Sequence, residues 1–134
     1  DAVARLPYSI VISDSIYADT DTPHPRMYGS FPKVLREYVR ERRVLTLEQA
    51  VAKMTSLPAR RINLADRGIL APGAFADVLI FDPARFRDRA TFAQPTRLAE
   101  GLDWVFLNGT PVWREGSLLC GSAGRCIVFS QDEK

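Results

Sequence analysis

The chain has 134 residues, a length that suits one ordinary domain. Hydrophobic residues make up 46% of it and charged residues 25%, which is typical of a globular protein. The net charge of +2 is too small to indicate a nucleic-acid partner, and no apolar run approaches the roughly 20 residues of a membrane-spanning helix, so we expect neither nucleic acid nor membrane as a partner.

Residues 8–13, YSIVIS, predict a short buried strand, because Ile10, Val11 and Ile12 form a continuous apolar run that ends at Asp14. Such runs are typical of parallel strands covered on both faces. The chain offers no other obvious parallel strand, and it begins without a methionine almost directly at this run. We therefore expect the chain to be a piece of a longer protein. Residues 17–30 that follow predict a polar loop.

A helix is predicted over residues 31–43, with Ser30 as its N-cap and Pro32 in its first turn. Its basic residues lie toward the C-terminal half, where the helix dipole favours them, and we expect a solvated face there. The apolar positions recur with helical period and form one stripe. The stripe consists of Phe31, Val34, Leu35, Tyr38 and Val39.

A second helix is predicted over residues 46–57, because Thr46 and Gln49 have the spacing of a capping box. Pro58 either ends this helix or restarts a short one that runs to residue 63.

The rest of the chain predicts a β-rich tail. Residues 76–81 predict a strand, whereas residues 84–100 are charged and irregular. Asn108-Gly109 lies between two apolar runs and favours a type I′ hairpin. Pro111 then places the second strand of the hairpin at an edge, or lies at its start. Residues 125–129 predict a last strand, followed by a frayed tail.

Cys120 and Cys126 match no zinc or redox spacing, and two cysteines make no disulfide framework. We expect ordinary thiols in a reducing cytoplasm.

Asp14 is the first candidate for chemistry. An acidic residue at the C-terminal end of a buried strand lies where α/β folds place their sites, and it could bind a cation or accept a proton. It could equally be a turn residue whose carboxylate bonds nearby backbone N–H groups.

The loop after Asp14 holds three further candidates. His24 could be a ligand or an acid–base, or could simply be exposed. Arg26 has a fork of donors that suits a carboxylate, although most surface arginines have no such role. Tyr28 could donate a hydrogen bond or pack. Nucleophile and phosphate-binding motifs are absent, and one histidine with two distant cysteines cannot supply a complete zinc site.

Several longer motifs resemble the D-aminoacylases, the N-acyl-D-amino-acid deacylases of the amidohydrolase superfamily. The resemblance runs from about residue 10 to residue 127. GILAPGAFADVLIFD (residues 68–82) and NG-x-x-V (residues 108–112) are shared widely across the superfamily. HPRMYGSFPKVL, TLEQAVAKMTSLPA and DPARFRDRATF are more specific to the D-aminoacylase branch.

The resemblance implies a fold class and a division of the chain. We expect residues 1–63 to be the C-terminal end of a TIM-like (β/α)8 barrel, with residues 8–13 as its last strand. Residues 64–130 would belong to a small β-sandwich, and residues 131–134 to a tail.

The resemblance also implies a zinc-dependent hydrolase that cleaves N-acyl-D-amino acids to a carboxylate and a D-amino acid. Asp14 matches the aspartate that serves as general base and acid on metal-bound water and is a partial metal ligand. Arg26 matches an arginine for the substrate carboxylate, with His24 and Tyr28 as neighbours in the substrate site. The other zinc ligands of the family are absent, so we expect this chain to be inactive and zinc-free by itself. Ser15 departs from the family, which has a glycine there.

Two alternatives remain open. The chain could be a non-catalytic structural or interaction module, with self-association through apolar surface left by the absent barrel. It could also be a fragment of another amidohydrolase, similar to a dihydropyrimidinase or a cytosine deaminase.

Overall fold

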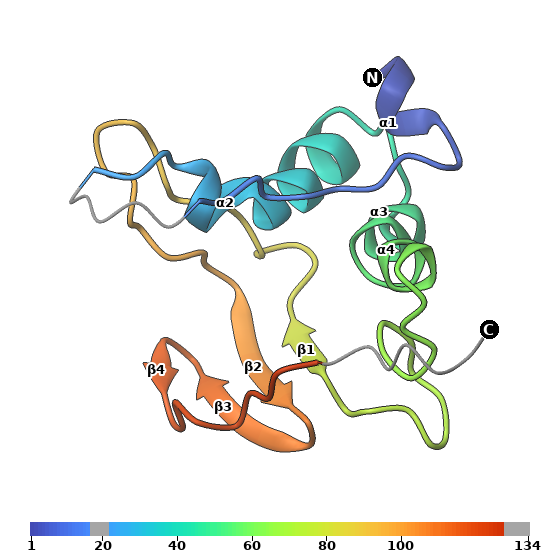
Figure 1. Cartoon of the computed structure of the whole chain (residues 1–134). Coiled ribbons are helices and arrows are strands. Elements are labelled where there is room, and N and C mark those ends of the chain that lie inside the picture. The colour runs from blue at the N-terminus through green and yellow to red at the C-terminus, as the bar shows by residue number, and fades with distance from the viewer. Residues whose placement is uncertain (17–21, 128–134) are drawn as a thin grey trace.

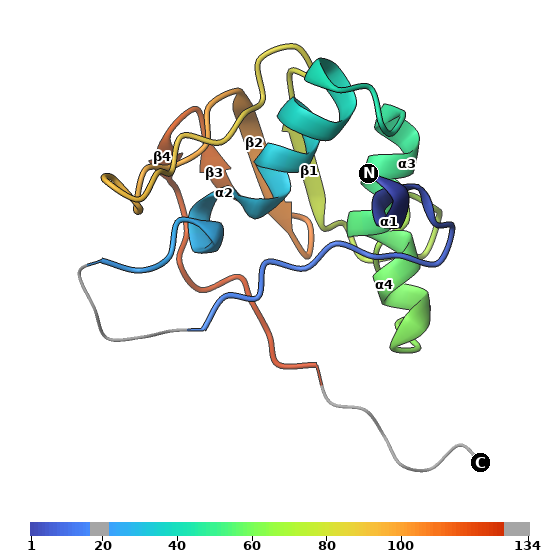
Figure 2. The same ribbon diagram turned by 90° about the horizontal axis from the view of Figure 1, so that it is seen from above.

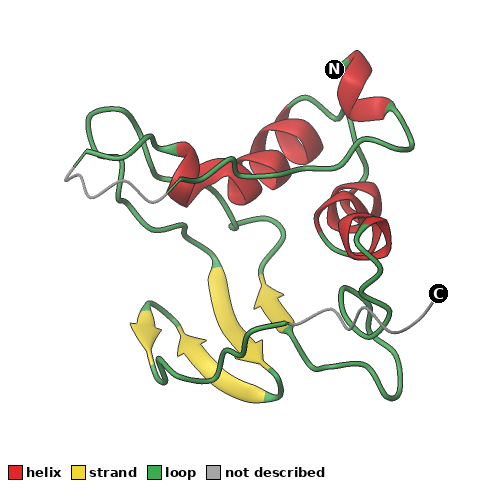
Figure 3. Ribbon diagram, in the orientation of Figure 1, coloured by secondary structure: helices red, strands yellow, loops and turns green. Residues whose placement is uncertain are grey.

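The computed structural model of the chain describes residues 1–16 and 22–127. The helices of this part are α1 (Ala2–Arg5), α2 (Arg26–Lys33), η1 (Val34–Glu41), α3 (Leu47–Met54) and α4 (Ser56–Arg61). The strands are β1 (Val78–Phe81), β2 (Leu102–Leu107), β3 (Thr110–Arg114) and β4 (Ser117–Leu118). Figure 1 shows the helices gathered in one part of the molecule and the sheet in another, and Figure 3 marks the same division by colour.

The first predicted helix begins earlier than the sequence indicated. α2 starts at Arg26 with Pro25 as its N-cap, so the predictions of Ser30 as a cap and Pro32 in the first turn were wrong. Pro25 already has helical angles, φ −59° and ψ −17°, and therefore starts the helix inside the stretch predicted to be a loop. η1 then continues as a π-helix, which ends with the Arg42 N–H donating to Glu37 O.

The capping box at the start of α3 is confirmed. Thr46 Oγ1 accepts a hydrogen bond from the Gln49 N–H at 3.2 Å, and Gln49 Oε1 accepts one from the Thr46 N–H at 3.0 Å. The helix breaks at Thr55, whose φ of −130° and ψ of −85° are not helical. α4 restarts at Ser56, so Pro58 lies within its first turn and does not end the preceding helix.

The buried core joins both halves of the chain. Leu35 of η1 and Ala50 of α3 pack with Phe86, which follows β1 in the chain. Phe86 also stacks at a tilt on Phe81 of β1, with ring centroids 5.0 Å apart. The full cluster consists of Leu35, Val44, Leu45, Ala50 and Phe86. One small apolar cluster therefore holds η1, α3 and the first strand together.

The prediction of a buried strand over residues 8–13 was wrong. Residues 9–16 have no strand assignment, and Ile10 and Ile12 are 41% and 67% exposed. The Val11 N–H donates to Lys53 O on α3 at 3.1 Å, not to a neighbouring strand. Figure 1 shows this blue segment beside the helices and away from the sheet, whereas in the view of Figure 2 it passes next to the ends of β1 and β2 in projection. An apolar run forms a strand only where a partner completes its ladder, and the described chain provides none here.

The hairpin at Asn108-Gly109 is confirmed. The sheet is antiparallel throughout, in the order β1-β2-β3-β4. Asn108 and Gly109 have φ angles of 50° and 82°, which are the positive values that a type I′ turn needs. Pro111 lies opposite Phe106 near the start of β3, as predicted. β1 is two residues shorter at its start than the predicted strand over residues 76–81.

The end of the chain differs from the prediction. Residues 125–127 are not in a strand, and residues 128–134, which include the rest of that predicted strand and the predicted tail, lie outside the described residues. The described part combines helices with an antiparallel sheet, and the boundary at residues 63 and 64 stays a prediction. In residues 1–16 and 22–127 there is no helix long and apolar enough to cross a bilayer.

Candidate functional site

The turn His24-Pro25-Arg26 orients the start of α2. His24 Nδ1 accepts a hydrogen bond from the Arg26 N–H at 3.1 Å, and His24 O accepts one from the Met27 N–H at 3.0 Å. The first backbone donors of a helix have no partner within the helix, so the histidine acts in place of a capping side chain. This bond makes Nδ1 the acceptor nitrogen of the imidazole ring.

Asp14 and Arg26 form an ion pair across the loop that the sequence placed between them. Arg26 Nη1 lies 2.8 Å from Asp14 Oδ2, with 41% and 61% of the respective side chains exposed. Asp14 has a φ of 49°, in the left-handed region, which is uncommon outside glycine and aspartate or asparagine. The two residues that the resemblance singled out thus lie in direct contact.

The third candidate, His24, contacts a residue that the sequence analysis missed. The edge of one ring meets the face of the other, since the centroids of His24 and Phe92 are 5.1 Å apart and the rings are inclined by 81°. Phe92 is 80% exposed and belongs to the irregular segment before β2. Phe92 is the last residue of the motif DPARFRDRATF, but its contact with His24 depends on tertiary packing, which the motif does not indicate.

The segment around Phe92 runs along α2 and η1. Gly29 is buried where a Cβ atom would meet Asp88 Cβ at 3.4 Å and Ala90 Cβ at 3.6 Å. Arg36 of η1 donates to both carboxylate oxygens of Asp88, from Nε at 2.7 Å and from Nη2 at 3.3 Å. These contacts support the helix that begins at Arg26.

Tyr28 is half-buried on α2. Within the described residues its hydroxyl forms no hydrogen bond with Asp14 or Arg26, so the structure does not add it to the ion pair. Its predicted contact with substrate stays a prediction.

The described residues do not fit a complete metal site. Residues 1–16 and 22–127 contain no group of three or more histidine, cysteine, aspartate or glutamate side chains that could hold a metal ion. Asp14 could supply one oxygen ligand, whereas zinc sites need three or four protein ligands. Cys120 lies next to Ser122, whose backbone N–H lowers the pKa of the thiol, and it does not join Asp14 in a ligand group.

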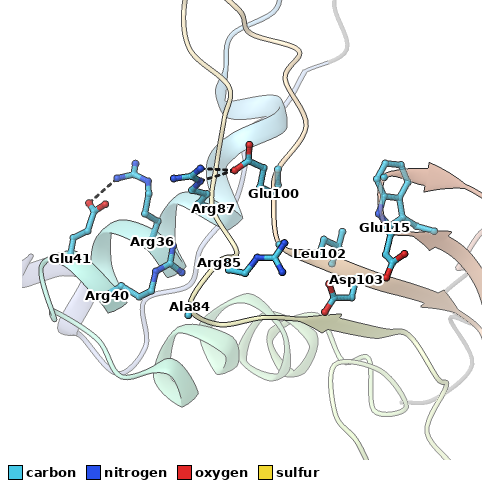
Figure 4. A pocket seen from close by; sticks show the side chains of 14 residues that line it. Arg36, Arg40, Glu41, Ala84, Arg85, Arg87, Glu100, Leu102, Asp103 and Glu115 are labelled. Atoms are coloured by element: carbon cyan, nitrogen blue, oxygen red, sulfur yellow. Dashed lines mark hydrogen bonds and ion pairs between the residues drawn. The ribbon is translucent and has the colours of Figure 1, made fainter.

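A groove of about 770 Å³ lies between η1 and the sheet (Figure 4). Its walls come from η1, from the residues after β1, and from β2 and the turn after β3. Several of its charges neutralise one another, as Arg36 does with Glu41 at 2.8 Å and Arg87 with Glu100 at 2.7 Å. None of the four predicted site residues lines this groove.

The sequence profile of the amidohydrolase family matches residues 10–113. The chain is 46% identical to the D-aminoacylase of Alcaligenes xylosoxydans xylosoxydans over 120 residues, which is 90% of this chain and 25% of that protein. It is 54% identical to the N-acyl-D-glutamate deacylase of the same organism over 104 residues, covering 78% of this chain and 21% of the relative. The chain thus spans about a quarter of the curated relatives it matches.

Solved structures agree with these matches. A crystal structure of D-aminoacylase that defines a novel subset of amidohydrolases superposes with a TM-score of 0.87 at 41% identity, over 92% of this chain and 26% of that one. The N-acyl-D-glutamate deacylase of Bordetella bronchiseptica, complexed with zinc and a phosphonate mimic of the tetrahedral intermediate, gives a TM-score of 0.78 at 50% identity, over 81% of this chain and 23% of that one. The resemblance inferred from the motifs is confirmed, and the chain belongs to the amidohydrolase family, in which it resembles the D-aminoacylases.

Proposed function

We propose that the chain carries one side of the active site of a zinc-dependent N-acyl-D-amino-acid deacylase. The reaction releases a carboxylate and a D-amino acid. The observation that carries the proposal is the 2.8 Å contact between Asp14 and Arg26, in a chain whose relatives at 46% and 54% identity are D-aminoacylase and N-acyl-D-glutamate deacylase. Because the relatives at this identity are deacylases, a dihydropyrimidinase-like or deaminase-like parent is not favoured.

Arg26 has the chemistry to bind the substrate carboxylate. Its planar guanidinium donates two parallel hydrogen bonds to a carboxylate, and Asp14 occupies one of these donors in the structure. A substrate carboxylate would compete for the same fork and release the Asp14 oxygens. His24 would keep Arg26 oriented through its bond to the Arg26 N–H.

Asp14 has the chemistry to move a proton. Once Arg26 binds the substrate carboxylate in its place, the Asp14 oxygens are free to accept a proton. In the proposed reaction Asp14 takes a proton during the attack of water on the amide carbonyl and delivers it to the leaving amine. Since the described residues do not fit a complete zinc site, we expect this chain not to retain zinc by itself.

The experiment uses a hybrid enzyme, in which this chain replaces the segment that it matches in the Alcaligenes D-aminoacylase. We expect the zinc-loaded hybrid to hydrolyse N-acetyl-D-amino acids and not the L-enantiomers, and the 134-residue chain alone to show no turnover with added zinc. A folded hybrid that binds zinc and hydrolyses neither enantiomer would contradict the proposed function. Turnover by the isolated chain would contradict the proposal that it carries only one side of the site.

A further inference from the structure

Lys53 is buried although it carries a charge. Among the residues that the structure describes, it is the one buried charged residue, with 5% exposure. Nζ lies 2.5 Å from Leu6 O, 3.0 Å from Ser9 O and 2.9 Å from Ser9 Oγ. An ammonium group has three N–H donors, so all of them have acceptors.

The surroundings of Lys53 indicate that its buried charge has a structural role. Removing an ammonium group from water is unfavourable unless hydrogen bonds replace its hydration. In the described part of the chain no carboxylate lies within ion-pairing distance of Nζ, and the three acceptors are neutral oxygens of one short segment. The ammonium therefore gathers residues 6–9 around itself.

The backbone of Lys53 extends this hold toward Asp14. Lys53 O accepts a hydrogen bond from the Val11 N–H at 3.1 Å. Ser9 Oγ also donates to Leu6 O at 3.0 Å, which closes the turn that the ammonium binds. One residue of α3 thus contacts the segment before Asp14 at Leu6, Ser9 and Val11. These bonds take the place of the strand ladder that the sequence led us to expect.

We propose that Lys53 is a positioning residue for Asp14, fixing the segment that presents this carboxylate to Arg26. We call the hydrogen bonds that join Lys53 to Leu6, Ser9 and Val11 the clamp. The inference rests on the proposed function, because the clamp would serve to position a residue of the proposed active site. Lys53 itself is not a catalytic residue, since its Nζ is buried and all three of its N–H groups are used.

The first test measures amide hydrogen exchange in the 134-residue chain. Lys53→Met keeps an unbranched side chain as far as Cε and removes the ammonium. We expect exchange at Val11 to accelerate about tenfold, as the loss of a locally stabilising hydrogen-bond cluster would produce. Lys33→Met is the matched control, because Lys33 is an exposed lysine of α2, and it should leave exchange at Val11 unchanged.

A milder substitution keeps the test usable if Lys53→Met prevents folding. Ser9→Ala removes one acceptor of the ammonium and leaves Lys53 in place, so it should accelerate exchange at Val11 by a smaller factor. If Lys53→Met folds and exchange at Val11 is unchanged, the clamp is overturned. If Lys53→Met does not fold, unchanged exchange at Val11 in Ser9→Ala overturns it.

The second test measures kinetics in the hybrid enzyme. We expect Lys53→Met to lower kcat by about 100-fold, the size of effect that a misplaced reacting group produces. KM should change less than about threefold because Arg26 keeps its own support from His24. Lys53→Arg retains donors and should recover part of kcat. Equal kcat in Lys53→Met and wild type would overturn the positioning role. An inactive wild-type hybrid would instead contradict the proposed function, and the exchange test would then decide whether the clamp exists.

Discussion

Asp14 Oδ2 lies 2.8 Å from Arg26 Nη1, and both side chains are open to solvent. Exposed ion pairs contribute at most about 1 kcal/mol to folding, so this pair does little for stability. We expect Asp14→Asn to change the free energy of unfolding of the chain by less than about 1 kcal/mol. In the hybrid enzyme the same substitution should lower kcat by about 100- to 10,000-fold, because it removes a proton-transfer group.

The matched control for that substitution is Asp66→Asn. Asp66 is an exposed aspartate for which the described structure shows no ion pair, so its replacement should affect neither stability nor kcat. Urea denaturation of the chain and steady-state kinetics of the hybrid give the two readouts. If Asp14→Asn lowered the free energy of unfolding enough to explain its lower kcat, the argument for a catalytic role of Asp14 would fail.

The capping box of α3 gives a prediction about stability alone. Thr46→Ala removes the hydroxyl that accepts from the Gln49 N–H and should lower the free energy of unfolding by about 1 kcal/mol. The loss should appear in the global transition, because Ala50 of α3 is fully buried in the core. Thr46→Ser keeps the acceptor and is the control. Equal denaturation midpoints for Thr46→Ala and wild type would show that the cap does not limit stability.

The features that the sequence predicted correctly are local ones. The capping box depends on Thr46 and Gln49, three positions apart, and the hairpin depends on the adjacent residues Asn108 and Gly109. The strand predicted over residues 8–13 failed because a strand requires a distant partner, and its apolar composition carries no information about whether that partner is present. Helix starts such as that of α2 depend on the angles of one proline, Pro25, which sequence reasoning assigned to a loop.

The candidate site divides in the same way. Asp14 and Arg26 came from motif resemblance, and the structure brings them into contact, although their roles stay predictions. The contacts of Phe92 and Lys53 could not be predicted from the motifs that contain them, since each residue reaches its partner across a long stretch of chain. The ring of Phe92 contacts His24 because an irregular segment packs there, and the buried ammonium group of Lys53 donates a hydrogen bond to Ser9 Oγ.

Gly109 is predicted to be the sensitive position of the hairpin. Its φ of 82° is strained for any residue with a Cβ, so Gly109→Ala should destabilise the chain by about 1 kcal/mol. No atom lies within 4 Å of the added Cβ, and the effect would therefore come from the backbone alone. Gly121→Ala is the control, because a Cβ there also meets nothing within 4 Å and its φ is not positive. Thermal denaturation should separate the two variants, and equal midpoints would contradict the assignment of strain.

Arg36 offers an internal comparison of two ion pairs. It binds Asp88, whose side chain is 14% exposed, through Nε and Nη2, and it binds Glu41, which is 52% exposed, through Nη1. The hydrogen bond to Asp88 is the main cause that raises the pKa of Arg36 above its ordinary value. Asp88→Ala should lower the free energy of unfolding by about 1–3 kcal/mol, because it removes two charged hydrogen bonds at a largely buried position.

Glu41→Ala is the matched comparison for Asp88→Ala, since it removes a partner from the same guanidinium. The lost pair is exposed, so we expect a loss below about 1 kcal/mol. Urea denaturation of both variants measures the difference. If Glu41→Ala lowered stability as much as Asp88→Ala, burial of the Asp88 pair would not be the reason for its effect.

Glu100 joins the irregular segment to the sheet and makes stability depend on pH. Arg87 donates from Nε to Glu100 Oε2 at 2.9 Å, and this hydrogen bond is the main cause that lowers the pKa of the carboxyl. The backbones of the same two residues form an isolated antiparallel bridge. The carboxylate is therefore stabilised in the folded chain relative to the unfolded chain.

A carboxyl whose folded pKa is depressed stabilises the fold above its unfolded pKa, which is about 4.3 for glutamate, and loses that contribution as the pH falls through the folded pKa. Wild type should therefore be more stable than Glu100→Gln at neutral pH by a constant amount, and the difference should shrink from about pH 5 downward. Arg87→Gln should reduce this pH-dependent difference, because it removes the main cause of the lowered pKa, and the smaller contributions of Arg89 and Arg97 would remain. Urea denaturation of the three proteins at a series of pH values measures it. A difference between wild type and Glu100→Gln that stays constant on acidification would show that Glu100 is not held as the carboxylate by Arg87.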